Sequence, residues 1–158
     1  MSNDSMSNDM SEHRPPLAPI GLHVTRVAKT LSRAFDDALA AEGGSVPTWL
    51  ILLSLKTGRP ETQRELARAI GIEGPTLTHH LDALERNGLV RRSRDGTNRR
   101  VVRVDLTAAG DAAFLRLRRA AQAFDERLRE GIGDDDLARV RELLAALQAN
   151  ASYIRKTP

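Results

Sequence analysis

Two short helical patterns followed at once by a change of period, between residues 62 and 106, constrain the fold of this chain most. The sequence Thr62-Gln63-Arg64-Glu65 has the form of a capping box, in which the threonine side chain accepts a hydrogen bond from a free backbone N–H group and the glutamate reaches back. A second helix is predicted to open at Pro75, after a turn that Gly71 allows. The predicted buried faces are Leu66, Ala69 and Ile70 in the first helix and Leu77, Leu81 and Leu84 in the second. Two helices joined by a glycine-containing turn predict a helix-turn-helix.

The next segment alternates apolar and polar residues, which is the period of a strand. Residues 89–94 and 102–106 are the predicted strands, and Asp95-Gly96 between them is a strong hairpin signal. Residues 86–103 hold seven arginines against one aspartate, a local charge of +6, although the whole chain carries +3. The positive charge is therefore local, which indicates a surface for a polyanion such as DNA.

Longer helical patterns lie on both sides of this middle part. Each carries one apolar stripe with steps of three and four residues. The stripes are Ile20, Val24, Val27, Leu31, Phe35 and Ala38 in the first helix, Phe114, Leu117, Ala121, Phe124 and Leu128 in the next, and Leu137, Val140, Leu144, Leu147, Ala151 and Ile154 in the last. A single copy would expose a large apolar patch, so we expect the stripes to bury against each other and a second copy. A self-contained bundle is the alternative.

These patterns predict a mainly α protein with a small β-hairpin wing. Its expected parts are a disordered tail at residues 1–16, a winged helix-turn-helix domain at residues 46–107 and a helical dimerisation region at residues 17–45 and 108–154. The chain has no cysteine, which excludes disulfides and thiolate metal sites. No run of about 18 apolar residues predicts a membrane span, and no secretory signal is recognised, so a cytoplasmic location is expected. We expect that the protein binds no metal or cofactor. We also expect that it is not an enzyme, because the sequence has no phosphate-binding glycine loop and no recognisable set of nucleophile, base and acid.

The order of the helices and two motifs resemble the MarR family of bacterial winged-helix regulators. The motifs are LARAIGIEGPTLTHHLDALERNGLVRR at residues 66–92 and NRRVVRVDLTAAG at residues 98–110. The resemblance covers about residues 17–154. It implies a dimer that is held by its terminal helices and binds pseudo-palindromic DNA.

The second helix of the helix-turn-helix is expected to read bases with its exposed N-terminal residues. With the leucine stripe inward, the candidates are Pro75, Thr76, Thr78 and His79. Ordinary helix-start chemistry is the alternative for the threonines. His80 lies at the edge of the stripe and is expected to be half-buried. Since adjacent helical residues diverge by about 100°, the two histidines predict no metal site.

The DNA contacts of the wing are assigned to Arg92, Arg94, Asn98, Arg99 and Arg100. A hairpin tip fits the minor groove, where arginine is favoured. The resemblance implies that one arginine of the last pair enters this groove, and we favour Arg100. The family usually has aspartate at the position of Asn98. Asparagine lacks the negative charge that would orient the arginine, although it can still form a hydrogen bond. The alternative for these arginines is that they only keep the edge of the hairpin solvated and so prevent aggregation. Phosphate contacts are predicted for Gln63, Arg64 and Arg86, with solvent exposure as an equal alternative.

The family resemblance also implies a cleft for small aromatic or phenolic acids between the dimerisation helices and the winged domain. By this analogy the candidate lining residues are His23, Arg26, Val27, Trp49 and Leu53. An arginine or histidine beside apolar walls suits a carboxylate. The alternative is that Trp49 belongs to the core and Arg26 to the surface. The peroxide-sensing mechanism of the family needs cysteine, so this chain, which has none, cannot use it.

The sequence therefore predicts a dimeric, sequence-specific transcriptional regulator that binds double-stranded DNA. It is expected to be a repressor that a small aromatic or phenolic carboxylate releases. An architectural or nonspecific DNA-binding protein is one alternative, and a winged-helix protein-interaction module is the other.

Overall fold

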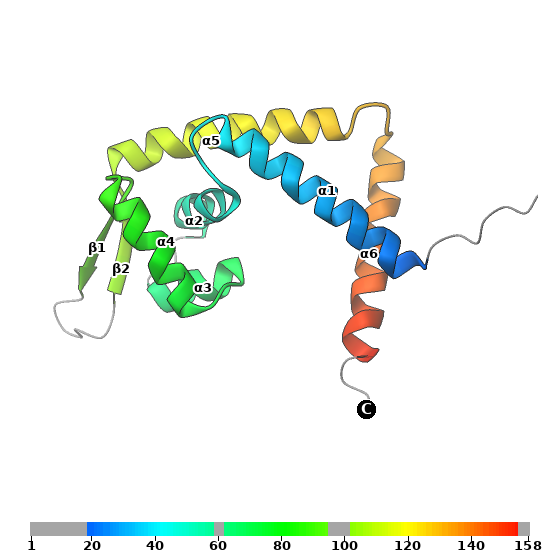
Figure 1. Cartoon of the computed structure of the whole chain (residues 1–158), viewed down its shortest axis with the longest axis horizontal. Helices are drawn as coiled ribbons and strands as arrows, with labels where there is room; N and C mark the ends of the chain where they lie inside the picture. Colours follow the sequence, from blue (N-terminus) through cyan, green and yellow to red (C-terminus); the bar gives the residue numbers. More distant parts are fainter. Residues whose placement is uncertain (1–18, 59–61, 95–101, 155–158) are drawn as a thin grey trace, which may run out of the picture. The chain divides into compact units, whose positions relative to one another are not determined.

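The computed structural model describes residues 19–58, 62–94 and 102–154. Within them it has six helices and one antiparallel hairpin, so the predicted mainly α fold with a small β-hairpin is confirmed (Figure 1). The elements are α1 Ile20–Ala40, α2 Val46–Thr57, α3 Gln63–Ile70, α4 Gly74–Arg86, β1 Val90–Arg94, β2 Val102–Leu106, α5 Ala108–Leu128 and α6 Asp134–Ile154. The chain divides into two units after Arg33. The described part of the first unit is the start of α1, on which Ile20, Leu22 and Val27 are exposed.

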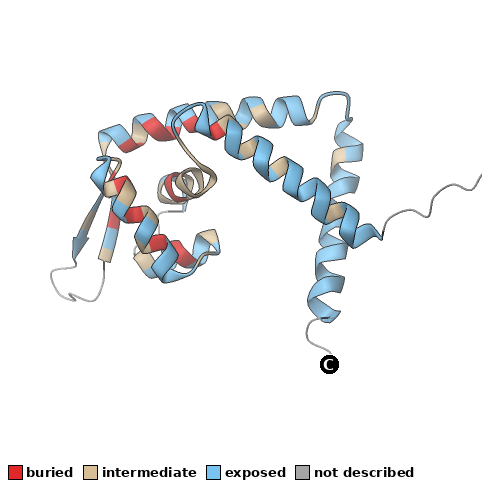
Figure 2. Ribbon diagram, viewed as in Figure 1, coloured by how far each residue is buried: buried red, intermediate tan, exposed pale blue. Residues whose placement is uncertain are grey.

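The second unit has one hydrophobic core, which lies among α2, α3, α4, the hairpin and the first half of α5 (Figure 2). Its fully buried side chains are Leu39, Ile51, Leu52, Leu66, Leu77, Leu81 and Leu117. The stripe predicted for α4 is confirmed, since Leu84 is buried with Leu77 and Leu81. In α3 the prediction for Ala69 was wrong: Ala69 is exposed and Ala67 is buried, because the core contacts this short helix along Leu66 and Ala67.

Local chemistry sets where α3 begins and ends. The predicted capping box is present: Thr62 Oγ1 accepts from the backbone N–H of Glu65, and Glu65 Oε2 accepts from that of Thr62, both at 3.1 Å. Gly71 ends the helix with φ of +71°, a left-handed conformation that side chains with a Cβ rarely adopt. This turn leads directly into α4, so the helix-turn-helix is specified within a few residues.

Close backbone contacts connect the hairpin to α5. The strands pair with Val90 opposite Leu106 and Arg92 opposite Val104. After β2, the backbone N–H of Thr107 donates to the Leu89 carbonyl at 3.1 Å, and the Thr107 hydroxyl accepts from the N–H of Gly110 at 3.0 Å, which caps α5. Gly110 packs so closely that a Cβ built on it would overlap the Leu89 carbonyl oxygen. The start of the hairpin and the start of α5 are therefore in backbone contact.

The apolar stripes of α5 and α6 differ in burial. On α5, Phe114 and Leu117 are buried, and the Phe124 ring lies 5.1 Å from that of Phe35. On α6 no described residue is buried, and the stripe residues Val140, Leu144, Leu147 and Ile154 are exposed. None of the described helices has the length and apolar character needed to cross a membrane.

Candidate nucleic-acid interface

The first turns of α4 carry exposed side chains. Pro75, Thr76 and His79 are exposed, while the leucines of the opposite face are buried. His80 is half-buried, as predicted. Among the described residues, no group of three histidine, aspartate or glutamate side chains could hold a metal ion.

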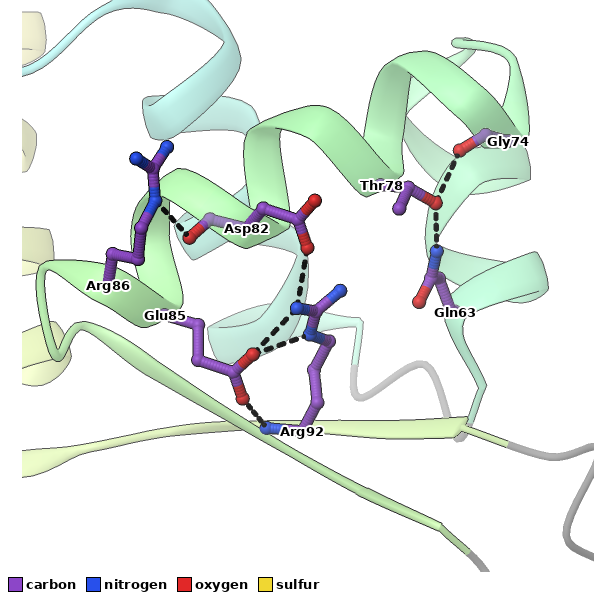
Figure 3. A network of polar contacts seen from close by, with 7 residues as sticks. All are labelled: Gln63, Gly74, Thr78, Asp82, Glu85, Arg86 and Arg92. Carbon is purple, nitrogen blue, oxygen red and sulfur yellow. Dashed lines mark hydrogen bonds and ion pairs between the residues drawn. The ribbon is translucent and has the colours of Figure 1, made fainter.

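Thr78 is half-buried between α3 and α4 rather than freely exposed (Figure 3). Its hydroxyl accepts from Gln63 Nε2 at 2.7 Å and donates to the Gly74 carbonyl at 3.0 Å. The structure thus joins two of the predicted site residues, Gln63 and Thr78, in one contact that fixes the start of α3 against α4. The predicted phosphate ligand Arg64 is exposed, and Arg86 Nε donates to the Asp82 carbonyl at 3.2 Å.

The strand alternation sorts the described arginines of β1 onto two faces. Arg92 and Arg94 share the face of the buried Val90, and Arg91 lies on the other face. Arg92 is half-buried, whereas Arg91 and Arg94, which is the last residue of the strand, are exposed. The predicted DNA contacts Asn98, Arg99 and Arg100 lie outside the described residues.

Arg92 lies in a network with two carboxylates of α4 (Figure 3). Its Nη2 lies 2.6 Å from Asp82 Oδ1 and 2.6 Å from Glu85 Oε2, and its Nε donates to Glu85 Oε2 at 2.9 Å. The backbone N–H of Arg92 also donates to Glu85 Oε1, at 2.9 Å. The hydrogen bonds from the Arg92 side chain, and next from its backbone, hold the pKa of Glu85 below its ordinary value of 4.5. The same side-chain hydrogen bond raises the pKa of Arg92 above its ordinary value.

Asp82 and Glu85 were not among the predicted site residues. The available signal was the period of β1, because Val90 and Arg92 two residues apart must share a face. An arginine on the core-facing side of a strand needs an acidic partner, and Asp82 and Glu85 are the acids of the preceding helix.

Two concave surfaces of about 770 Å³ each lie within the second unit. The first, here called the α3–hairpin groove, is lined by Thr62, Gln63, Arg64, Ala67, Gly74, Thr78 and Val102. The second, here called the α2–α5 groove, is lined by Trp49, Leu53, Lys56, Thr57, Phe114, Leu115, Arg118, Ala121, Gln122, Asp125, Glu126 and Arg129. Three predicted DNA-site residues, Gln63, Arg64 and Thr78, line the first groove, and two predicted ligand-site residues, Trp49 and Leu53, line the second.

The α2–α5 groove has an aromatic wall and basic side chains. The rings of Trp49 and Phe114 are stacked, with centroids 5.7 Å apart and planes 7° from parallel. Lys56, whose Nζ lies 2.6 Å from Asp111 Oδ1, and Arg118 also line it. Phe114 and Arg118 were missed because they lie on α5, far from α2 in the sequence. Lys56 lies one helical turn after the predicted Leu53, so helical period could have found it. The other predicted ligand residues, His23, Arg26 and Val27, belong to the first unit, where they are exposed.

A helix-turn-helix whose second helix exposes its first turns, followed by an arginine-bearing hairpin, defines a winged helix-turn-helix protein. A sequence model of the MarR family matches residues 45–102, which span this motif. The chain belongs to the MarR family.

Solved structures of transcription regulators resemble the chain over nearly its whole length. MosR of M. tuberculosis, in complex with DNA, is 31% identical with a TM-score of 0.69, and the match covers 87% of this chain and 98% of that one. The transcriptional repressor CouR, bound to a 23-mer DNA duplex, is 27% identical with a TM-score of 0.75, covering 82% and 92%. CouR from Rhodococcus jostii RHA1, bound to p-coumaroyl-CoA, is 26% identical with a TM-score of 0.68, covering 82% and 92%.

Proposed function

We propose that this protein is a cytoplasmic transcriptional repressor that binds pseudo-palindromic DNA as a homodimer and is released by a small aromatic carboxylate. The observation that carries the DNA-binding part is the exposed start of α4 beside exposed arginines of β1. The DNA-bound structures of MosR and CouR support it.

In the proposed complex, α4 lies in the major groove and the hairpin reaches the minor groove. Thr76 and His79 contact base edges, and Pro75 sets the start of the helix against the groove. Thr78 contributes mainly by holding Gln63, since its hydroxyl already has both a donor and an acceptor. Arg94 contacts the DNA backbone, while Asn98, Arg99 and Arg100 act at the tip of the wing. Gln63, Arg64 and Arg86 supply further phosphate contacts.

The test is to select duplexes from a random library with the purified protein and compare their affinity with that of unselected DNA. A regulator binds the selected sequence at least about 10³-fold more tightly. His79→Ala should reduce the ratio of the affinity for selected DNA to that for unselected DNA. Arg94→Gln should lower the affinity for both duplexes and reduce the slope of log Kd against log salt concentration by about one unit. Arg139→Gln, an exposed change on α6, is the matched control. Equal affinity for both duplexes would favour an architectural protein, and no affinity would favour an interaction module.

The dimer part of the proposal is supported by the exposed stripe of α6. Its apolar residues recur in steps of three and four, the spacing of helices that pack side by side with a partner. Monomeric proteins rarely leave so large an apolar face in water. Leu144→Glu places a charge in the middle of the stripe, so sedimentation should show a monomer. The affinity of this variant for DNA should be strongly reduced. An unchanged sedimentation coefficient for wild type and variant at every concentration would contradict the proposal.

The ligand part is supported by the α2–α5 groove. Stacked aromatic rings suit a planar ring of the ligand, and Arg118 suits its carboxylate, since Lys56 is already paired with Asp111. CouR with bound p-coumaroyl-CoA supports an aromatic acid or its thioester. Titration of labelled DNA complexes with p-coumarate, salicylate and p-coumaroyl-CoA should release the DNA, and Arg118→Gln should raise the concentration needed. Retention of DNA with all three compounds would contradict this choice of ligand class.

A further inference from the structure

The Arg92 network joins the hairpin to α4 at a point where apolar packing does not. At the base of the hairpin, Val90 is buried, and the N–H of Leu89 donates to the Leu84 carbonyl at 2.9 Å. Two residues further along β1, Arg92 is flanked by open space on both sides. One cavity, of about 490 Å³, is lined by His79, Asp82, Glu85, Arg86 and Arg92, and another, of about 340 Å³, by Gln63, Glu85, Arg92, Ser93, Arg94 and Val102. Arg92 therefore bridges a gap between strand and helix.

Glu85 holds both the side chain and the backbone of Arg92. One carboxylate oxygen accepts from the guanidinium and the other accepts from the backbone N–H of the same residue. Two contacts from one carboxylate fix the position and the direction of the strand at this residue. Asp82, one helical turn earlier, accepts from the same Nη2 that donates to Glu85, so the guanidinium is held between two carboxylates of α4.

The charge of Arg92 is already compensated. The guanidinium faces two carboxylates, so the three groups together carry a formal charge of −1. Its side chain is 23% exposed, and its Nε and Nη2 donate to carboxylates, so a DNA phosphate that approached Nη1 would also meet the negative charges of Asp82 and Glu85. The exposed Arg91 and Arg94 meet no such competition in the contacts described above.

We propose that Arg92 is a positioning residue, which fixes the hairpin relative to α4 through Asp82 and Glu85 and contributes no phosphate contact of its own. This role rests on the proposed DNA binding, because its consequence is a preset spacing between the base-reading side chains of α4 and the arginines beyond Arg92. Presetting this spacing removes an ordering cost from complex formation. The role differs from the DNA contact that the sequence suggested for this arginine.

The first test removes an acid rather than the arginine. Glu85→Gln keeps the size of the side chain but weakens both contacts to Arg92. If the network positions the wing, affinity for a duplex selected by the wild-type protein should fall about tenfold, although the protein has lost a negative charge. If Arg92 instead contacts phosphate, the same change frees it and removes repulsion, so affinity should rise. A rise overturns the proposal.

The second test separates position from charge. Arg92→Gln should weaken binding while the slope of log Kd against log salt stays that of the wild type. Arg94→Gln, the matched change two residues on, should reduce that slope by about one unit. Arg92→Lys keeps the charge but loses the paired geometry, so it should bind as weakly as Arg92→Gln. A slope reduced by one unit in Arg92→Gln, or wild-type affinity in Arg92→Lys, overturns the proposal.

Hydrogen exchange measured in the absence of DNA tests the positioning role of Arg92 independently of the proposed DNA binding. Glu85→Gln should accelerate exchange of the β1 amides, that of Arg92 included, while amides of α2 keep wild-type rates and report an intact core. Unchanged exchange in β1 overturns the positioning role even if the protein binds DNA specifically. A wild-type protein without sequence preference would refute the proposed function, and the exchange result would still decide whether Arg92 holds the hairpin.

Discussion

Gly110→Ala is a substitution for which helix propensity and packing predict opposite signs. Alanine is favoured over glycine inside a helix by about 1 kcal/mol, so propensity alone predicts a more stable protein. Gly110 lies in the first turn of α5, where a Cβ would overlap the Leu89 carbonyl oxygen and lie 3.0 Å from the Leu89 carbonyl carbon and 3.2 Å from Leu106 Cδ2. Because the overlapped atom is backbone, α5 has to move away from the start of the hairpin.

The expected loss of stability follows from three contributions. Overpacking a filled site costs about 1–3 kcal/mol. The shift stretches the 3.1 Å hydrogen bond from Thr107 to Leu89, which contributes about 1 kcal/mol. The gain in propensity offsets about 1 kcal/mol of this. The net destabilisation is therefore about 1–3 kcal/mol, or a fall of about 2–12 °C in Tm for a chain of this size.

Thermal unfolding followed by circular dichroism measures this change in Tm. One protein concentration is used throughout, because the Tm of the proposed homodimer depends on concentration. Gly21→Ala is the matched control: it also lies in the first turn of a helix, and a Cβ there meets nothing within 4 Å. The control should melt at or slightly above the wild-type temperature. If Gly110→Ala melts there too, the close approach of α5 and Leu89 does not exist in solution.

Three further changes test the core, the cap and the network. Leu81→Ala, at a fully buried position of α4, should lower the free energy of unfolding by about 2–5 kcal/mol in urea titrations, and a loss under about 1 kcal/mol would contradict its place in the core. Thr62→Ala should cost about 0.5–2 kcal/mol through the lost capping box, and Thr62→Ser should restore most of it; equal stability of both variants would argue against the cap. The lowered pKa of Glu85 contributes stability that is fully present above its ordinary value of 4.5 and is lost as the pH falls through the lowered value. The difference in Tm between wild type and Glu85→Gln should therefore be constant near neutral pH and shrink in acid, and a difference independent of pH would show that this carboxylate is not held by Arg92.

The features that the sequence predicted correctly depend on neighbours in the chain. The capping box at Thr62 and the left-handed turn at Gly71 involve residues at most a few positions apart, so their chemistry is visible in the sequence itself. The leucine stripe of α4 follows from helical period alone. These local signals fix the order of the helix-turn-helix and the hairpin.

The parts that could not be predicted depend on tertiary contacts. Composition gives the number of arginines around the hairpin but not which of them is compensated, and Arg92 is distinguished only by its approach to Asp82 and Glu85. Thr78 points away from the leucine stripe as predicted, yet α3 brings Gln63 onto its hydroxyl. Helical period predicts which face a residue occupies, and only the packing of helices decides what meets that face.

The stacked pair in the α2–α5 groove has a spectroscopic consequence. Trp49 is the one tryptophan of the sequence, so the intrinsic indole fluorescence of the protein comes from a single place. That indole lies against Phe114 and lines the groove, half-buried, where its emission depends on local polarity and quenching. Occupancy of the groove can therefore be followed without a label, while a dye on the DNA reports release in the same cuvette. The two signals, recorded together, give the order in which the two events occur.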